Sequence, residues 1–185
     1  MTIKLDASLR RRKPEKRLER LTARPVDRLL SVSTLPIEAV AILADTNVYI
    51  AEAAGTLSDE AAAVLSRSLL FHCSVCLAEI AAGIGNADPS HPRWAESRDH
   101  YAGLMSGMPP ARVLTPDDAI WLDAGILAGT LARTQNYQRH QRKEALNDAL
   151  ILLTAARNGL PVLTSDRTDF DLLQQLAPET TFYWY

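Results

Sequence analysis

Residues 40–50 read VAILADTNVYI, an apolar run that ends in an acid and passes directly into a helical pattern. Five consecutive apolar residues predict a buried strand at 40–44. The polar residues that follow are typical of a helix start, and Gly55 ends the helix expected over 46–54. Asp45 therefore stands where a strand ends and a helix begins.

The rest of the chain repeats this alternation of short apolar runs and longer helical segments. Further strands are expected at 69–73, 111–114, 162–164 and 181–185. Helices are expected between them, at 58–67, 75–84, 94–105, 115–133, 144–158 and 169–176. This order predicts an α/β fold, with a central parallel sheet of four to five short strands and helices on both faces.

The composition is that of a globular protein. Of 185 residues, 47% are hydrophobic and 23% are charged, which excludes a wholly disordered chain and a disulfide-stapled miniprotein. No apolar run approaches the roughly 20 residues that a membrane-spanning helix needs. Pro36 and Glu38 interrupt the apolar stretch before the first strand, so a cleaved export signal is not expected. With only two cysteines, we expect a cytoplasmic protein.

Charge divides the chain into a basic leader, residues 1–38, and a domain at 39–185. Residues 1–30 hold ten Lys and Arg against four acids, a net charge of +6, whereas the other 155 residues carry a net charge of −8. Such a leader either binds phosphate or an acidic partner, or is a disordered or helical arm in solvent. Both interpretations stay open at this point.

Four acids occupy positions that predict a shared site. Asp45 and Asp166 follow the first and fourth expected strands, and the carboxyl ends of parallel strands meet at one edge of a sheet. Glu79 and Asp148 are single acids in otherwise apolar helices next to strands. Taken singly, each acid has an ordinary alternative, as a helix cap or a surface residue.

Converging carboxylates repel one another, and a buried charge is costly unless it is paired or bound to a metal. No Lys or Arg adjoins Asp45, Glu79 or Asp148 in the sequence. Oxygen ligands of this kind suit Mg²⁺ or Mn²⁺. Water on such an ion can attack phosphorus, so the acids indicate metal-dependent phosphodiester hydrolysis.

Several stretches of the sequence resemble the PIN domain, and in particular the VapC-type toxin ribonucleases of bacterial toxin–antitoxin pairs. These stretches are ADTNVYI at 44–50, the single acid Glu79, NDALI at 147–151 and VLTSDRTDF at 162–170. The resemblance covers residues 40–185 in family order, whereas the leader and the long region at 86–110 lie outside the family pattern.

The resemblance implies a set of site residues and partners. Asp45, Glu79, Asp148 and Asp166 would be the catalytic and metal-binding acids, with Asp169 as a fifth. Thr46, Asn47 and Thr164 would be polar groups that support them. The implied activity is cleavage of RNA that depends on Mg²⁺ or Mn²⁺, and the implied partner is a cognate antitoxin. A catalytically silent RNA- or protein-binding module of the same fold is the alternative.

Further residues suggest contacts with RNA and with proteins. A basic connector is expected at 134–143, and its neighbourhood would bind phosphates and stack a base through Arg133, Tyr137, Arg139, His140, Arg142 and Lys143. An ordinary exposed connector is the alternative. The aromatic end at 182–185 suggests a contact in a homodimer or with an antitoxin. Cys73 and Cys76 match a redox motif, but their apolar surroundings favour core thiols.

Overall fold

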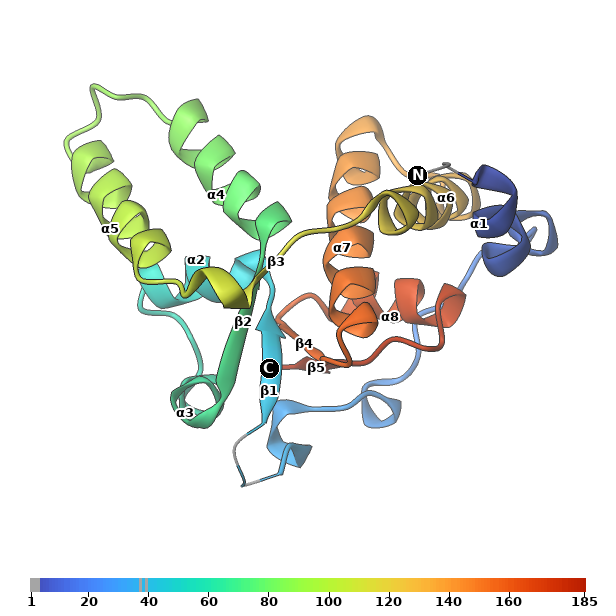
Figure 1. Ribbon diagram of the computed structural model, residues 1–185, viewed down its shortest axis with the longest axis horizontal. Coiled ribbons are helices and arrows are strands. Elements are labelled where there is room, and N and C mark those ends of the chain that lie inside the picture. Colours follow the sequence, from blue (N-terminus) through green and yellow to red (C-terminus); the bar gives the residue numbers. More distant parts are fainter. Residues whose placement is uncertain (1–3, 37, 39) are drawn as a thin grey trace.

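The computed structural model describes residues 4–36, 38 and 40–185. Its centre is a parallel sheet of five strands in the order β3-β2-β1-β4-β5 (Figure 1). The strands are β1 (Ala41–Ala44), β2 (Leu69–Cys73), β3 (Val113–Leu114), β4 (Val162–Thr164) and β5 (Phe182–Trp184). The predicted α/β fold with a central parallel sheet is confirmed.

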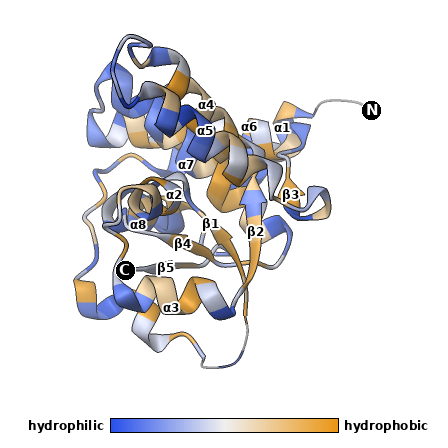
Figure 2. Cartoon of the chain, turned by 90° about the vertical axis from the view of Figure 1, so that its left-hand side faces the viewer, coloured by the Kyte–Doolittle hydropathy of each residue, from blue (hydrophilic) through white to orange (hydrophobic). Residues whose placement is uncertain are grey.

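Strand β1 lies in the middle of the sheet because its residues are apolar on both faces. Leu43 pairs with Phe71 of β2 on one side and with Val162 of β4 on the other. Ile42, Leu43 and Ala44 are all buried. Figure 2 colours β1 and most of β2 as hydrophobic, which agrees with strands that are covered on both faces.

Helices cover the two faces of the sheet in chain order. Those between β1 and β3 lie on one face, and those between β3 and β5 lie on the other (Figure 1). The first group is α2 (Thr46–Ala53), α3 (Asp59–Arg67), α4 (Ser74–Asn86) and α5 (Trp94–Ser106). The second group is α6 (Asp118–Gln135), α7 (Arg139–Arg157) and α8 (Arg167–Leu176). The change of face follows from the reversal of strand order after β3, because parallel crossovers are right-handed.

The prediction of a connector at 134–143 is wrong, because most of these residues are helical. Helix α6 continues to Gln135, and Asn136 ends it in the left-handed conformation with φ 61°. Helix α7 already begins at Arg139, where the Gln141 side chain accepts a hydrogen bond from the backbone N–H of Gln138 at 2.8 Å. Only three residues join the two helices, which therefore pack side by side.

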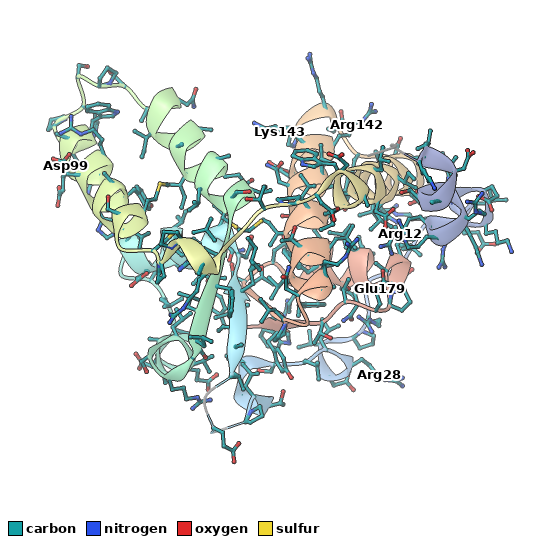
Figure 3. The ribbon with its side chains drawn as sticks, viewed as in Figure 1. Arg12, Arg28, Asp99, Arg142, Lys143 and Glu179 are labelled. Carbon is teal, nitrogen blue, oxygen red and sulfur yellow. The ribbon has the colours of Figure 1, made fainter. Side chains whose placement is uncertain are left out.

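The described part of the leader lies against the domain. Its helix α1 (Leu5–Arg12) packs on α6, where Arg11 and Arg12 both donate to the buried carboxylate of Asp123, at 2.7 and 3.0 Å. Short 3-10 turns follow at Pro14–Lys16, Val26–Arg28 and Val32–Thr34. Arg12 also pairs with Glu179, beyond α8 (Figure 3).

Leu30 of the leader lies beside the edge of the sheet. The backbone N–H of Trp184 in β5 donates to the carbonyl of Leu30 at 3.0 Å. Within the described residues, no helix combines the length and the apolar character needed to cross a bilayer.

Candidate metal centre

The site begins where β1 and β4 end. The buried side chain of Asp45 follows β1 and accepts a 2.7 Å hydrogen bond from the backbone N–H of Thr46, so it caps α2. Asp166 follows β4 and accepts from the backbone N–H groups of Thr168 and Asp169, both at 3.0 Å, so it caps α8. Because β1 and β4 are parallel neighbours, both acids lie at one edge of the sheet.

The buried hydroxyl of Thr164 connects the two strand ends. It donates to Asp45 Oδ2 at 2.8 Å and accepts from Asn47 Nδ2 at 3.1 Å and from the backbone N–H of Asp166 at 2.9 Å. Asn47 Oδ1 in turn accepts from the backbone N–H of Ser165 at 3.2 Å. This network fixes the Asp45 carboxylate relative to Asp166.

Glu79 of α4 is held by two side chains from other helices. Thr46 Oγ1 donates to Glu79 Oε2 at 2.5 Å, and Asn147 Nδ2 of α7 donates to Glu79 Oε1 at 2.7 Å. Both carboxylate oxygens therefore have a donor, which orients Glu79 at the same edge of the sheet.

The third part of the site is an acidic trio formed by Asp148, Asp166 and Asp169. Each offers one carboxylate oxygen, and these oxygens all lie within 4.8 Å of one another. Asp169 also accepts a 2.6 Å hydrogen bond from the hydroxyl of Tyr137. Carboxylates this close repel one another strongly unless protons or a cation neutralise them.

Burial and mutual repulsion make several of these acids reluctant to ionise. Burial, reinforced by the charges of Glu79 and Asp166, raises the pKa of Asp45 to about 7, although hydrogen bonds from Thr164 and Thr46 act in the opposite direction. Burial and the surrounding carboxylates, Asp45 first among them, raise the pKa of Asp148 well above its ordinary value. The pKa of Asp169 is also raised, chiefly by burial.

The described residues offer these acids no cationic partner. No Lys, Arg or His within the described part of the chain forms an ion pair with Asp45, Glu79, Asp148, Asp166 or Asp169. A set of close oxygen donors without a protein cation suits a hard divalent ion such as Mg²⁺ or Mn²⁺. The residues present therefore fit a metal of this kind.

The predicted acids form two groups in the structure. Asp148 and Asp166 lie together, and Asp169, expected only as a fifth acid, completes the trio with them. Asp45 and Glu79 lie at the same edge, where each is oriented by hydrogen bonds. Thr46 and Thr164 supply these bonds together with Asn147, which the sequence analysis missed, whereas Asn47 bonds to Thr164 rather than to an acid. The sequence feature that could have identified Asn147 is its position next to Asp148 in an apolar helix.

The basic residues expected to bind RNA have different surroundings. Arg133 donates to the leader carbonyls of Pro14 and Arg17, at 3.1 and 2.7 Å. Tyr137 is buried, so its ring is not exposed for stacking, and its hydroxyl is used by Asp169.

The other basic residues lie at the start of α7. Arg139, His140, Arg142 and Lys143 are exposed there, and Figure 3 shows Arg142 and Lys143 at this end of the helix. Arg142 also donates to the carbonyl of Tyr137 at 3.1 Å. A phosphate backbone can therefore reach these four side chains from solvent.

The two cysteines lie in the core, as their apolar surroundings in the sequence suggest. Cys73 and Cys76 are free thiols and both are fully buried. The Cys76 thiol donates to the carbonyl of Ala44 at 3.6 Å. Both are core residues beneath the strand ends.

A family model described as the PIN domain matches residues 42–174, well over half of the chain. The chain belongs to the PIN domain family. The match includes all five acids of the candidate metal centre and leaves the leader outside. PIN domains are generally nucleases, which agrees with an acidic site at the strand ends. The comparison with curated proteins gives no match.

Three solved structures similar to this PIN domain have TM-scores between 0.52 and 0.54, and one of them is described as a toxin–antitoxin system. VapBC-5 from Mycobacterium tuberculosis, a member of the VapBC family of such systems, matches at 25% identity and a TM-score of 0.53, over 78% of this chain and 98% of that one. VapBC2 from Rickettsia felis, bound to a promoter DNA fragment, matches at 12% identity and a TM-score of 0.54, over 79% and 98% of the two chains.

A third similar structure is FitAcB from Neisseria gonorrhoeae. It matches at 19% identity and a TM-score of 0.52, over 77% of this chain and 96% of that one. At 12% and 19% identity, the Rickettsia and Neisseria matches are evidence for the PIN fold alone.

Proposed function

We propose that the protein is an endoribonuclease that depends on a divalent metal ion, and that it acts as the toxin of a type II toxin–antitoxin pair. The acidic trio of Asp148, Asp166 and Asp169 is the observation that carries this proposal, because its oxygens lie within 4.8 Å of one another without a protein cation. Membership of the PIN family supports the nuclease activity.

Each acid has a proposed role in holding the metal. Asp45, Glu79, Asp148 and Asp166 would bind Mg²⁺ or Mn²⁺, together with Asp169. When bound, such an ion supplies positive charge for the phosphate and lowers the pKa of a coordinated water. Thr164 keeps the Asp45 carboxylate in place, and Asn147 does the same for Glu79, so that the site is preorganised.

RNA is the proposed substrate. Exposed cations at the start of α7, Arg139, His140, Arg142 and Lys143, would bind its phosphates beside the acids. Tyr137 has a different role in this proposal, since its hydroxyl orients Asp169. The cytoplasm is the compartment in which we propose that the protein acts, because Cys73 and Cys76 are free thiols.

A cognate antitoxin and a second copy of the chain are the proposed protein partners. The antitoxin is supported by the VapBC-5 structure, which is a toxin–antitoxin system at 25% identity. The homodimer would use exposed aromatic surface such as Trp121 on α6, which is 50% exposed. Sedimentation of the purified chain, alone and after co-expression with its neighbouring reading frame, tests both partners.

Cleavage of RNA by the purified full chain tests the proposed activity. We expect single-stranded or transfer RNA to be cut with Mg²⁺ or Mn²⁺ and to remain intact with a chelator. Asp148→Asn should abolish cutting, whereas Asp99→Asn should leave it unchanged, because Asp99 is an exposed acid on α5 (Figure 3). Equal cutting by both variants, or RNA binding without cutting in either metal, would contradict the proposal. The second result would favour a silent RNA-binding module.

A further inference from the structure

A cavity of about 610 Å³ lies between the leader and Asp169 of the acidic trio. Leader residues 20–23 form one wall, and Tyr137, Thr168 and Asp169 contribute to the other. The hydroxyl of Tyr137 and the carboxylate of Asp169 are hydrogen-bonded to each other at this wall. The cavity therefore shares Asp169 with the candidate metal centre and is completed by a segment outside the family match.

The leader wall is fixed to the domain on both sides. Arg24 donates to the buried Asp171 of α8 through its backbone N–H at 2.7 Å and its Nε at 2.5 Å. Gln175 Nε2 donates to the carbonyl of Thr22 at 3.1 Å. On the α6 side, the Gln135 amide lies within hydrogen-bond distance of Leu21 N (2.8 Å) and Leu21 O (3.3 Å). These contacts hold residues 20–23 in place as one wall of the cavity.

Arg20 differs from the arginines that hold the leader. Arg11, Arg12 and Arg24 form ion pairs with acids of the domain. Arg20 is exposed and lines the cavity, and within the described residues it forms no ion pair; its Nε lies 3.4 Å from the Gln135 amide. An arginine in this position carries a charge that the protein itself leaves unneutralised.

The remaining lining suits a nucleotide. Leu21 and Leu172 are apolar, whereas Gln141 and Thr168 provide polar groups at the same cavity. The volume lies within the range of pockets that hold small organic ligands, roughly 300–1,000 Å³. A base needs an apolar contact and a few polar groups, and its phosphate needs a cation, which Arg20 supplies.

We propose that this cavity binds the nucleotide next to the cleaved bond of a single-stranded nucleic acid, with Arg20 on its phosphate and its base against Leu21. This inference rests on the proposed function, since the strand is the one that the metal centre would cut. The leader thereby becomes part of the substrate site. An acidic peptide is the other ligand that an unpaired arginine would attract, and the experiment includes it.

Binding and cleavage by Arg20 variants of the full chain test this inference. The probe for binding is a fluorescent ten-nucleotide RNA measured in a chelator, because cutting should require a divalent metal ion and the backbone charge is unchanged. Arg20→Gln should weaken binding about fivefold and lower the slope of log affinity against log salt by about 0.7, the value for one single-strand phosphate contact. Arg20→Lys should retain that slope. On cleavable RNA, Arg20→Gln should raise KM and leave kcat unchanged.

Arg10→Gln is the matched control, because Arg10 is an exposed leader arginine on α1 outside the cavity. Equal losses of RNA affinity in Arg20→Gln and Arg10→Gln would overturn the inference. It would also be overturned if Arg20→Gln weakened the binding of an Asp- and Glu-rich peptide but not the binding of RNA. If the chain cuts RNA and Arg20→Gln has normal KM, the cavity assignment fails while the nuclease stands. If Arg20→Gln weakens binding but no metal supports cutting, the nuclease fails while the phosphate contact stands.

Discussion

Asn147 of α7 donates a 2.7 Å hydrogen bond to Glu79 of α4, although the two residues are 68 positions apart in the chain. The bond joins helices that cover opposite faces of the sheet, at the edge where β1 and β4 end. With Thr46 on its other oxygen, Glu79 is held in one orientation before any ligand binds. Residues beside the acids therefore fix the orientation of a carboxylate in the candidate metal centre.

Asn147→Ala should weaken metal binding by about 10- to 100-fold, the usual effect of removing a residue that orients a ligand. The fold should be retained, because Thr46 still donates to Glu79. Titration calorimetry with Mn²⁺ measures the affinity. Asn158→Ala is the matched control, since Asn158 makes a 2.8 Å bond to the Thr154 carbonyl at the other end of α7. Equal Mn²⁺ affinities in the two variants would count against the orienting role.

Asp148→Asn should stabilise the metal-free protein at alkaline pH. Because burial and neighbouring carboxylates raise the pKa of Asp148 in the folded state, the folded protein holds this proton more tightly than the unfolded chain does. Stability of the metal-free protein therefore falls as pH rises from about 4, the ordinary pKa of aspartate, towards the raised value. The variant lacks this penalty, and its Tm should exceed that of the wild type by about 2–4 °C above the raised pKa, the shift that corresponds to 1 kcal/mol.

Thermal melts in a chelator across the pH range test this stability prediction. The two proteins should have similar Tm values below about pH 4, where Asp148 is neutral in both folded and unfolded chains. Added Mn²⁺ should raise the Tm of the wild type and leave that of Asp148→Asn nearly unchanged. A lower Tm for the variant at alkaline pH would show that the Asp148 carboxylate stabilises the metal-free fold.

Arg12→Ala should destabilise the protein by about 2 kcal/mol or more, because it removes a partner of a buried carboxylate. Arg12 and Asp123 are each only 6% exposed in their side chains, and their atoms lie 2.9 Å apart. Arg11 still pairs with Asp123 in the variant, which limits the loss. Urea unfolding measures the effect against Arg10→Ala, for which we expect a change within about 0.5 kcal/mol. Equal losses in both variants would mean that α1 is not held by these pairs.

Acid should weaken the docking of the leader. Burial alone would raise the pKa of Asp123, but hydrogen bonds from Arg11, Ser8 and Arg12 and the nearby guanidinium charge lower it overall. Because the pKa of Asp123 is lower in the folded protein than in the unfolded chain, the ionised carboxylate stabilises the fold. This stabilisation is fully present above the ordinary aspartate pKa of about 4, and it is lost as the pH falls through the pKa of Asp123 in the folded protein. The unfolding free energy of Asp123→Asn should therefore depend less steeply on pH than that of the wild type below about pH 4. Parallel pH curves would contradict this linkage.

Much of the fold, and much of the acidic edge of the sheet, could be predicted from the sequence. Apolar runs such as 40–44 are strands because they must be covered on both faces, and an acid at their carboxyl end is then placed by topology alone. Asp45 and Asp166 were predicted in this way, and their strands β1 and β4 are neighbours. The grouping of Asp148, Asp166 and Asp169 depends on how α7 and α8 pack, which periodicity does not reveal.

Other features depended on long-range contacts that have no local signal. The polar stretch after residue 133 resembles a loop, yet a single left-handed residue, Asn136, is enough to end α6 and allow α7 to start. Tyr137 was expected to be exposed, but packing buries it against the site. The docked leader depends on ion pairs to Asp123 and Asp171, whose positions in amphipathic helices gave no indication of an arginine more than a hundred residues earlier.

Crystals of the full chain soaked in Mn²⁺ test the metal centre most directly, through anomalous diffraction. We expect a peak between the carboxylates of Asp148, Asp166 and Asp169, about 2.0–2.2 Å from at least two of their oxygens, the range for small divalent ions. No peak at this edge of the sheet, with the carboxylates instead paired to lysine or arginine side chains, would contradict the account.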